Sequence, residues 1–170
     1  AHKLYGMSAV TTLTAQNTTG VYGISVVAED FLANELECIF SDIFPDAVKI
    51  GMVSNAGLIE VIAEKLKKYH PSNIVLDPVM VSTSGSKLLR DDAQQALARL
   101  LMPLADVITP NIPEAEVLTG KKITESSDMV EAGKLIYDKL GGKTAVLIKG
   151  GHDLNTANDM LYVNDSPVWF

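Results

Sequence analysis

The sequence predicts an α/β fold built on a mostly parallel sheet, and three observations support this class. Short apolar runs alternate along the chain with longer segments whose apolar residues recur every three or four positions, which is the spacing of a helix. The apolar runs are continuous, as expected for strands buried between two layers of helices. Near the end, Asn164-Asp165 is a two-residue turn signal between two apolar runs. We therefore expect a three-layer αβα sandwich whose sheet ends in an antiparallel hairpin.

The period of the apolar residues places each element along the chain. Strands are predicted where apolar and β-branched residues form short runs, at residues 7–13, 21–27, 47–52, 74–76, 107–109, 145–148, 160–163 and 167–170. Helices are predicted where the spacing is helical, at residues 29–43, 58–69, 92–101, 113–118 and 129–140. Pro45 is expected to close the first of these helices.

The composition excludes several functional classes. The chain has 170 residues, of which 47% are hydrophobic and 21% charged, and this ordinary globular composition excludes disorder. A net charge of −7 argues against nucleic-acid binding. No apolar stretch reaches the about 18 residues that span a membrane, and the single Cys38 cannot form an internal disulfide. We expect a cytoplasmic protein with no membrane partner and assign no chemistry to Cys38.

Polar or glycine-containing segments follow several of the predicted strands. Ligands of open parallel sheets bind beyond the carboxyl ends of the strands, so these segments are the first candidates for a site. They are Gln16-Asn17, Gly51-Met52, Asp77-Pro78, Thr109-Pro110-Asn111 and Lys149-Gly150-Gly151. We expect all five strand ends to meet at one rim of the sheet.

Each of these motifs also has an ordinary structural explanation. Asp77 suits Mg²⁺ or a phosphate, but it also suits a turn before Pro78. Asn111 and Glu114 stand three residues apart at a predicted helix start, which is the pattern of a capping box that needs no ligand. Lys149 suits a phosphate, with backbone N–H groups of the following glycines close by, or a surface turn. The residues by themselves leave these alternatives open.

Other features of the sequence are interpreted as structural rather than functional. Met52 and Val79 are core residues by default, although apolar side chains at strand ends also line flat rings. Gly142-Lys143-Thr144 is rejected as a P-loop because it precedes a predicted strand rather than a helix. Residues 82–86 are read as a polar connection, with a flap over the site as the alternative.

Taken together, the strand-end segments resemble those of the hydroxymethylpyrimidine and phosphomethylpyrimidine kinases of thiamine biosynthesis, which are ribokinase-like. The resemblance covers essentially the whole chain, in the family's order. The matching segments are Tyr5-Gly6-Met7-Ser8, Thr14-Ala15-Gln16-Asn17-Thr18, Val48-Lys49-Ile50-Gly51-Met52, Leu76-Asp77-Pro78-Val79-Met80, Thr109-Pro110-Asn111-Ile112-Pro113-Glu114-Ala115 and Lys149-Gly150-Gly151-His152. The resemblance implies a ribokinase-like fold and ATP-dependent phosphorylation of 4-amino-5-hydroxymethyl-2-methylpyrimidine and then of its monophosphate.

The resemblance also assigns roles and partners. It implies aminopyrimidine contacts from Gln16, Met52 and Val79, support of Mg²⁺ by Asp77 and Glu114, and nucleotide or phosphate contacts from Asn111 and Lys149. These roles suit the side chains, because an amide pairs with a ring edge, carboxylates with a hard cation and an ammonium with a phosphate. ATP and Mg²⁺ are the implied cofactors, and a homodimer is the implied assembly.

Two segments of the family pattern are not found in this sequence. The family begins with a strand and a Gly-rich segment that contains a substrate-binding aspartate, and it ends with a Gly-Thr-Gly-Cys loop at a helix start. By resemblance the catalytic residue therefore lies beyond Phe170, and Cys38 does not replace it. We expect residues 1–170 to be the central portion of a single kinase domain and to be inactive by themselves. A pyridoxal or pyridoxine kinase of the same fold and a non-catalytic pyrimidine-binding module remain the alternatives.

Overall fold

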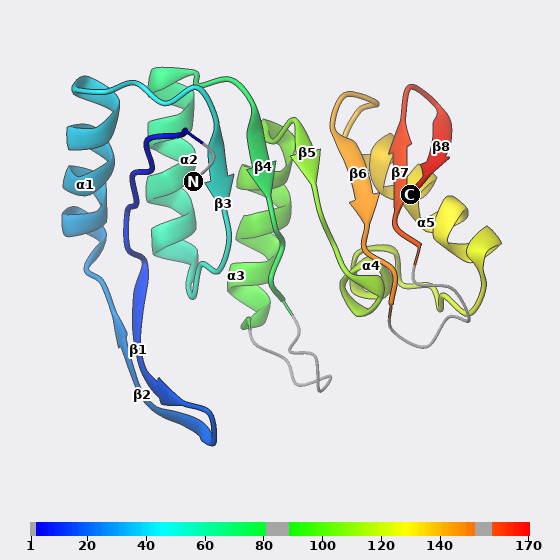
Figure 1. The fold of residues 1–170 in the computed structure, drawn as a ribbon, viewed down its shortest axis with the longest axis horizontal. Coiled ribbons are helices and arrows are strands. Elements are labelled where there is room, and N and C mark those ends of the chain that lie inside the picture. Colours follow the sequence, from blue (N-terminus) through cyan, green and yellow to red (C-terminus); the bar gives the residue numbers. More distant parts are fainter. Residues whose placement is uncertain (1–2, 81–88, 152–157) are drawn as a thin grey trace.

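The computed structural model describes residues 3–80, 89–151 and 158–170. The possible flap at residues 82–86 and His152 lie outside the described residues. Figure 1 shows the elements, which in chain order are β1 (Thr12–Asn17), β2 (Gly20–Val26), α1 (Glu29–Ser41), β3 (Val48–Ile50), α2 (Ala56–Tyr69), β4 (Ile74–Leu76), α3 (Asp91–Ala96), η1 (Leu97–Leu101), η2 (Met102–Leu104), β5 (Val107–Ile108), α4 (Ile112–Thr119), α5 (Ser126–Lys139), β6 (Ala145–Ile148), β7 (Met160–Val163) and β8 (Ser166–Trp169).

The main sheet is mostly parallel, as the sequence predicts. Its six strands lie in the order β3-β4-β5-β6-β7-β8, and every strand pairs with its neighbour along the chain. The pairs from β3 to β6 are parallel, and β7 and β8 continue the sheet antiparallel. The register aligns Ile50, Leu76, Ile108 and Val146 in one row across the parallel strands.

The terminal hairpin is confirmed at the expected turn. Asn164 and Asp165 have φ values of 50° and 57° between β7 and β8. Positive φ at both central residues is the geometry of the tight turn whose twist matches a two-residue hairpin, and Asn and Asp tolerate it better than most residues.

Helices pack on one face of the main sheet. Ile50, Leu76, Ile108 and Val146 are at most 7% exposed, and Figure 1 shows α2, α3 and α5 behind the strands. The opposite face is less covered, because the alternate residues Val75, Val107 and Leu147 are only half-buried. Within the described residues the sheet therefore has one complete helical layer, and the second layer of the expected sandwich is not among them.

The helix predicted at residues 92–101 is regular over only its first half. α3 ends at Ala96 and continues as the wider turn η1 and the tighter turn η2. Pro103, which lies in η2, has no N–H to donate, so a regular α-helix cannot continue through it. None of the described helices is long and apolar enough to span a bilayer.

The prediction for the first strand is wrong. This strand is expected at residues 7–13, whereas β1 runs from Thr12 to Asn17 and pairs with β2 in a separate two-stranded sheet. The Asn17 side chain accepts hydrogen bonds from Thr19 N at 2.8 Å and Thr19 Oγ1 at 2.7 Å. This turn closes the hairpin after Asn17, so Gln16 and Asn17 lie inside a strand rather than after one. Figure 1 shows the hairpin projecting from the body of the molecule.

Candidate functional site

The candidate site lies where β4, β5 and β6 end. Counted from the aligned row of Leu76, Ile108 and Val146, Asp77 is one residue further and Asn111 and Lys149 are three residues further. The backbones remain joined beyond the strands, because Asn111 and Lys149 form a parallel bridge and Lys149 N donates to Pro110 O at 2.9 Å. The strand register thus brings the three predicted residues to one edge.

Asp77 and Lys149 form an ion pair at this edge. Lys149 Nζ donates to Asp77 Oδ1 at 2.8 Å, and both side chains are partly buried. Asp77 is held in turn by its backbone, since Asp77 N donates to Ile50 O at 2.8 Å. A carboxylate and an ammonium in contact can bind a cation and an anion side by side, as a metal–phosphate complex requires.

Lys49 is a second cation beside Asp77 that the sequence analysis did not identify. Its Nζ lies 3.6 Å from Asp77 Oδ2, and its side chain is largely exposed. The strand register explains this contact, because Lys49 pairs with Val75 across the parallel strands. Asp77 is two residues beyond Val75 and therefore shares its face of the sheet.

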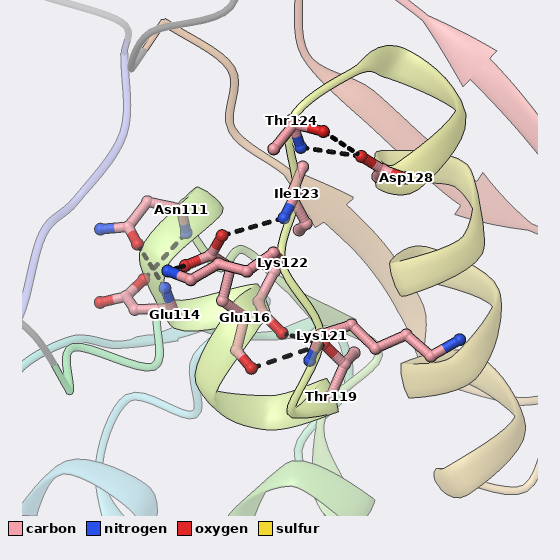
Figure 2. A network of polar contacts seen from close by, with 10 residues as sticks. Asn111, Glu114, Glu116, Thr119, Lys121, Lys122, Ile123, Thr124 and Asp128 are labelled. Carbon is pink, nitrogen blue, oxygen red and sulfur yellow. Dashed lines mark hydrogen bonds and ion pairs between the residues drawn. The ribbon is translucent and has the colours of Figure 1, made fainter.

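Glu114 is buried at the same edge, and its capping box is real. The side chain is 2% exposed. Asn111 Oδ1 accepts from Glu114 N at 2.8 Å, while Glu114 Oε2 accepts from Asn111 N at 2.9 Å, as Figure 2 shows. Asn111 and Glu114 therefore do form the capping box that their spacing indicates. Glu114 also lies close enough to Asp77 and Lys149 for their charges to act on its carboxyl.

Burial raises the pKa of the Glu114 carboxyl above its usual range. Hydrogen bonds from the backbone N–H groups of Asn111 and Met80 act in the opposite direction, as does the charge of Lys149. The negative charge of Asp77 adds to the upward shift of the pKa. The desolvated carboxyl therefore depends on its hydrogen bonds and on the nearby ammonium to stay ionised.

Met52 and Val79 follow the neighbouring strands β3 and β4. Met52 is 43% exposed, and its carbonyl oxygen accepts a hydrogen bond from Thr11 Oγ1 at 2.9 Å. Val79 is half-buried, and Val79 N donates to Asp77 O at 2.8 Å. The apolar side chains expected to line a ring thus lie on the two strand ends beside the charged group.

Gln16 does not lie with the other predicted residues on the strand ends of the main sheet. It is an exposed residue of β1, one position before the end of that strand, in the projecting hairpin. The expectation that five strand ends meet at one rim is therefore wrong for the Gln16-Asn17 segment. The reason is that β1 and β2, joined by the turn at Thr18-Thr19, form a two-stranded sheet of their own.

The two glycines after Lys149 have different reasons to be glycine. A Cβ on Gly150 would lie 2.2 Å from the backbone oxygen of Asn158, so the two backbones approach too closely for any side chain. Gly150 N already donates to Asp159 Oδ1 at 2.8 Å. Gly151 has a φ of +92°, which glycine tolerates best. The N–H of Gly150 is thus used within the fold, which the anion-binding interpretation did not foresee.

A polar network holds the far end of α4. Glu116 accepts from Ile123 N at 2.9 Å and from Lys122 Nζ at 2.8 Å. In the same connection, Asp128 at the start of α5 accepts from Thr124 N at 2.8 Å, as Figure 2 shows. The connection between α4 and α5 is therefore tied to both helices, and this fixes the helix whose first turn contains Asn111 and Glu114.

The donor set fits a magnesium ion shared with a ligand rather than a metal site made by protein alone. Among residues 3–80, 89–151 and 158–170, no three His, Cys, Asp or Glu side chains are grouped to hold a metal. Asp77 and Glu114 offer carboxylate oxygens at one edge, and Mg²⁺ commonly uses one or two carboxylates together with phosphate oxygens. Asp77 is the more accessible of the two.

Comparisons with known proteins agree with this arrangement. The model of the phosphomethylpyrimidine kinase family matches residues 1–170. A hydroxymethylpyrimidine/phosphomethylpyrimidine kinase of Staphylococcus aureus strain MSSA476 is 40% identical over 169 residues, which are 98% of this chain and 61% of that protein. The chain thus spans about three fifths of the length of this relative. A bifunctional thiamine biosynthesis protein of Geobacter sulfurreducens is 48% identical over 148 residues, covering 87% of the chain and 30% of that protein.

Solved structures share the fold. The crystal structure of phosphomethylpyrimidine kinase from Clostridium difficile 630 superposes with a TM-score of 0.92 at 45% identity, covering 99% of this chain and 72% of that one. An ADP complex of Bacillus subtilis pyridoxal kinase superposes with a TM-score of 0.86 at 34% identity, covering 98% and 64%. These kinases confirm the predicted fold class. The fold, the group of side chains at its strand ends and a match along all of its length lead to one conclusion, that the chain belongs to the phosphomethylpyrimidine kinase family.

Proposed function

We propose that the protein containing this chain is an ATP-dependent kinase of thiamine biosynthesis. It transfers the γ-phosphoryl group of ATP to the hydroxymethyl oxygen of 4-amino-5-hydroxymethyl-2-methylpyrimidine, and then a second phosphoryl group to the monophosphate formed. The observation that supports this most directly is the contact of Lys149 with Asp77 at strand ends next to Asn111. The names of the relatives supply the substrate class.

The polar side chains of the site have different roles at the phosphates of ATP. Lys149 and Asn111 would bind the nucleotide phosphates, and Asp77, the more accessible carboxylate, would hold the magnesium ion that accompanies them, supported by the buried Glu114. When bound, Mg²⁺ neutralises charge on the phosphate oxygens. The acceptor oxygen attacks the γ-phosphorus, the bond to the β-phosphate oxygen breaks and the hydroxyl proton departs to a base. The use of ATP is supported by the solved complexes of related pyridoxal kinases with ADP and with AMP-PCP.

The acceptor occupies the side of the site next to β3 and β4. Met52 and Val79 follow these strands and offer apolar surface to a planar ring. Gln16 belongs to the hairpin, so its contact with the aminopyrimidine requires the hairpin to reach the ring in the bound state. The base that receives the hydroxyl proton is expected in the family's Gly-Thr-Gly-Cys loop, outside residues 1–170.

We further propose a cytoplasmic homodimer of this kinase, in which residues 1–170 form part of one domain. The buried apolar residues of the described chain form one cluster, which favours a single domain. The hairpin offers exposed apolar side chains, and residues 4–28 contain no charged residue. Because each copy has a net charge of −7, two copies approach with least repulsion through such an uncharged surface.

A coupled assay of ADP release by the intact gene product tests the kinase. The acceptors are the hydroxymethylpyrimidine, its monophosphate and pyridoxal, each with Mg²⁺ and ATP. We expect turnover with both pyrimidines and a much lower kcat/KM with pyridoxal. A preference for pyridoxal would favour the alternative pyridoxal kinase, for which the 34% identical B. subtilis structure is the supporting observation. Binding of the pyrimidine without ADP release would favour a non-catalytic module.

A further inference from the structure

Glu114 differs from Asp77 in what its carboxylate contacts. Asp77 contacts the ammonium groups of Lys149 and Lys49 and remains accessible. Glu114 is 2% exposed, and each of its oxygens accepts a backbone N–H group: Oε2 from Asn111 at 2.9 Å and Oε1 from Met80 at 3.2 Å. The carboxylate thus joins two segments of backbone.

These two segments follow adjacent strands of the sheet. Asn111 follows β5 and caps the start of α4, whereas Met80 follows β4 and lies three residues beyond Asp77. The hydrogen bond from Met80 spans 34 residues of sequence and is buried. The Glu114 side chain therefore links the segment that contains Asp77 and Val79 to the one that contains Asn111.

Both backbone polar groups of Met80 form hydrogen bonds outside its own segment. Its carbonyl oxygen accepts a hydrogen bond from Leu89 N at 3.4 Å, so the residues on the two sides of positions 81–88 are joined at Met80. Both Met80 and Leu89 are buried, at 2% and 4% exposure. Pro78 has no N–H, and Val79 N donates to Asp77 O within the segment. The hydrogen bond from Met80 N to Glu114 thus joins the segment after β4 to the segment after β5.

We infer that Glu114 is a positioning residue, which holds Met80 and Asn111 through their backbone N–H groups, and not a ligand of the metal ion. This inference rests on the proposed kinase function and revises the metal role that the resemblance implied for this residue. It also explains the choice of side chain. Both partners are donors, so the side chain needs two acceptor atoms, which a carboxylate has and an amide lacks.

Two substitutions in the intact protein separate the positioning role from a metal role. Glu114→Gln keeps the shape but replaces one acceptor with a donor. Glu114→Asp keeps the charge but shortens the reach by one methylene, so it cannot contact Met80 and Asn111 together. Glu64→Gln is the control, because it removes the carboxylate of an exposed residue of α2, outside the site.

The first measurement is amide hydrogen exchange of the peptides that contain Met80 and Asn111. We expect each variant of Glu114 to exchange at least about tenfold faster in at least one of these two peptides than the wild-type protein and the Glu64→Gln control, because a buried hydrogen bond to a charged group is lost. This readout does not require turnover. A wild-type protein without activity would remove the proposed function and leave this test intact.

The second measurement is the Mg²⁺ dependence of kcat and KM. We expect both variants to lower kcat/KM for the pyrimidine about tenfold or more, with the Mg²⁺ concentration at half-maximal rate within about twofold of the wild-type value. A tenfold rise in that concentration for Glu114→Gln, with near-normal behaviour of Glu114→Asp, would identify Glu114 as a metal ligand and overturn the inference. Unchanged exchange at Met80 and Asn111 in both variants would also overturn it.

Discussion

Lys149 is the residue on which the charge balance of the site depends. Its ammonium contacts Asp77, and its charge also acts on the carboxyl of Glu114, whereas Lys49, the other cation that contacts Asp77 among the described residues, is largely exposed. We expect Lys149→Met in the intact protein to lower kcat/KM about 100-fold or more, because the phosphate contact proposed for Lys149 would be lost. Steady-state kinetics check this, with Lys143→Met as the exposed control. A loss of less than fivefold would contradict the role of Lys149 at the phosphates.

The same substitution should change the dependence of stability on pH. The raised pKa of Glu114 means that its ionisation destabilises the fold as pH rises from about 4.5 through the folded value. Lys149 opposes this shift, so its removal raises the pKa of Glu114 further. We expect Lys149→Met to lose more stability at pH 8 than at pH 4, as measured by urea unfolding at both values. An equal loss at both would contradict this coupling.

Glu37 provides the opposite pH dependence away from the site. Hydrogen bonds from Lys65, Lys68 and Tyr69 lower the pKa of its carboxyl from 4.5 to about 2 and tie α1 to α2. Its contribution to stability is therefore present above pH 4.5 and lost as pH falls toward 2.

We expect Glu37→Gln to be less stable than the wild-type protein at pH 7 and equally stable near pH 2. Urea unfolding across this pH range measures the difference, and Glu64→Gln on the exposed side of α2 is the control. A difference that stays constant with pH would show that Glu37 acts by packing rather than by charge.

At the level of single residues, the sequence could predict that Asp77, Asn111 and Lys149 lie at one edge. Asp77 and Lys149 directly follow apolar runs, Asn111 comes shortly after one, and parallel strands end at the same edge of a sheet. The sequence could not predict the bond from Met80 N to Glu114, which joins a side chain to a distant backbone group. The position of Gln16 was not predictable in the same way, because the hydrogen bond from Thr19 N to the Asn17 side chain sets where the first strand ends.

Among the elements, α5 and β7 show how closely two surfaces can approach. A Cβ on Gly133 would lie 2.7 Å from Met160 Cε and 3.1 Å from Tyr162 Cβ. Alanine favours a helix over glycine by about 1 kcal/mol, but forcing a methyl group into a packed contact costs about 1–3 kcal/mol. Met160 can shift its flexible end, whereas the Cβ of Tyr162 is fixed to the strand.

We therefore expect Gly133→Ala to lower the free energy of unfolding by about 1 kcal/mol. Urea unfolding of the intact protein gives this value. Lys134→Ala, on the exposed side of the same helix, should change it by less than about 0.5 kcal/mol. A Gly133→Ala protein more stable than the wild type would mean that the packing of α5 on β7 tolerates the methyl group.

The elements were predictable to the extent that their signals are local. The hairpin of β7 and β8 follows from Asn164-Asp165, and α2 and α5 follow from helical spacing. The change from α3 to η1 at Leu97 has no comparable signal, although Pro103 marks the later point at which a regular α-helix cannot continue.

At the scale of the whole molecule, the projecting hairpin of β1 and β2 exposes apolar side chains that the rest of the described chain does not cover. Tyr22, Ile24 and Val26 share one face of β2 and are 71%, 63% and 46% exposed. A two-stranded hairpin is marginally stable by itself, so apolar side chains on it favour a second packing surface.

We expect the intact protein to be a dimer in solution and Ile24→Lys to dissociate it. Light scattering during size-exclusion chromatography measures the mass of each. Val117→Lys, at an exposed apolar residue of α4, is the control and should remain dimeric. A monomeric wild-type protein, or a dimer that persists in Ile24→Lys, would place any assembly elsewhere.

The contact between Asp77 and Lys149 has a consequence for the order of events when ligands arrive. A divalent cation that engages Asp77 frees the ammonium, and a polyphosphate that engages Lys149 frees the carboxylate. Each ligand therefore replaces one partner of the Asp77–Lys149 ion pair, and this leaves the other side chain available for the second ligand. Nucleotide and magnesium should therefore strengthen one another's affinity reciprocally, because either one alone must separate opposite charges without compensation.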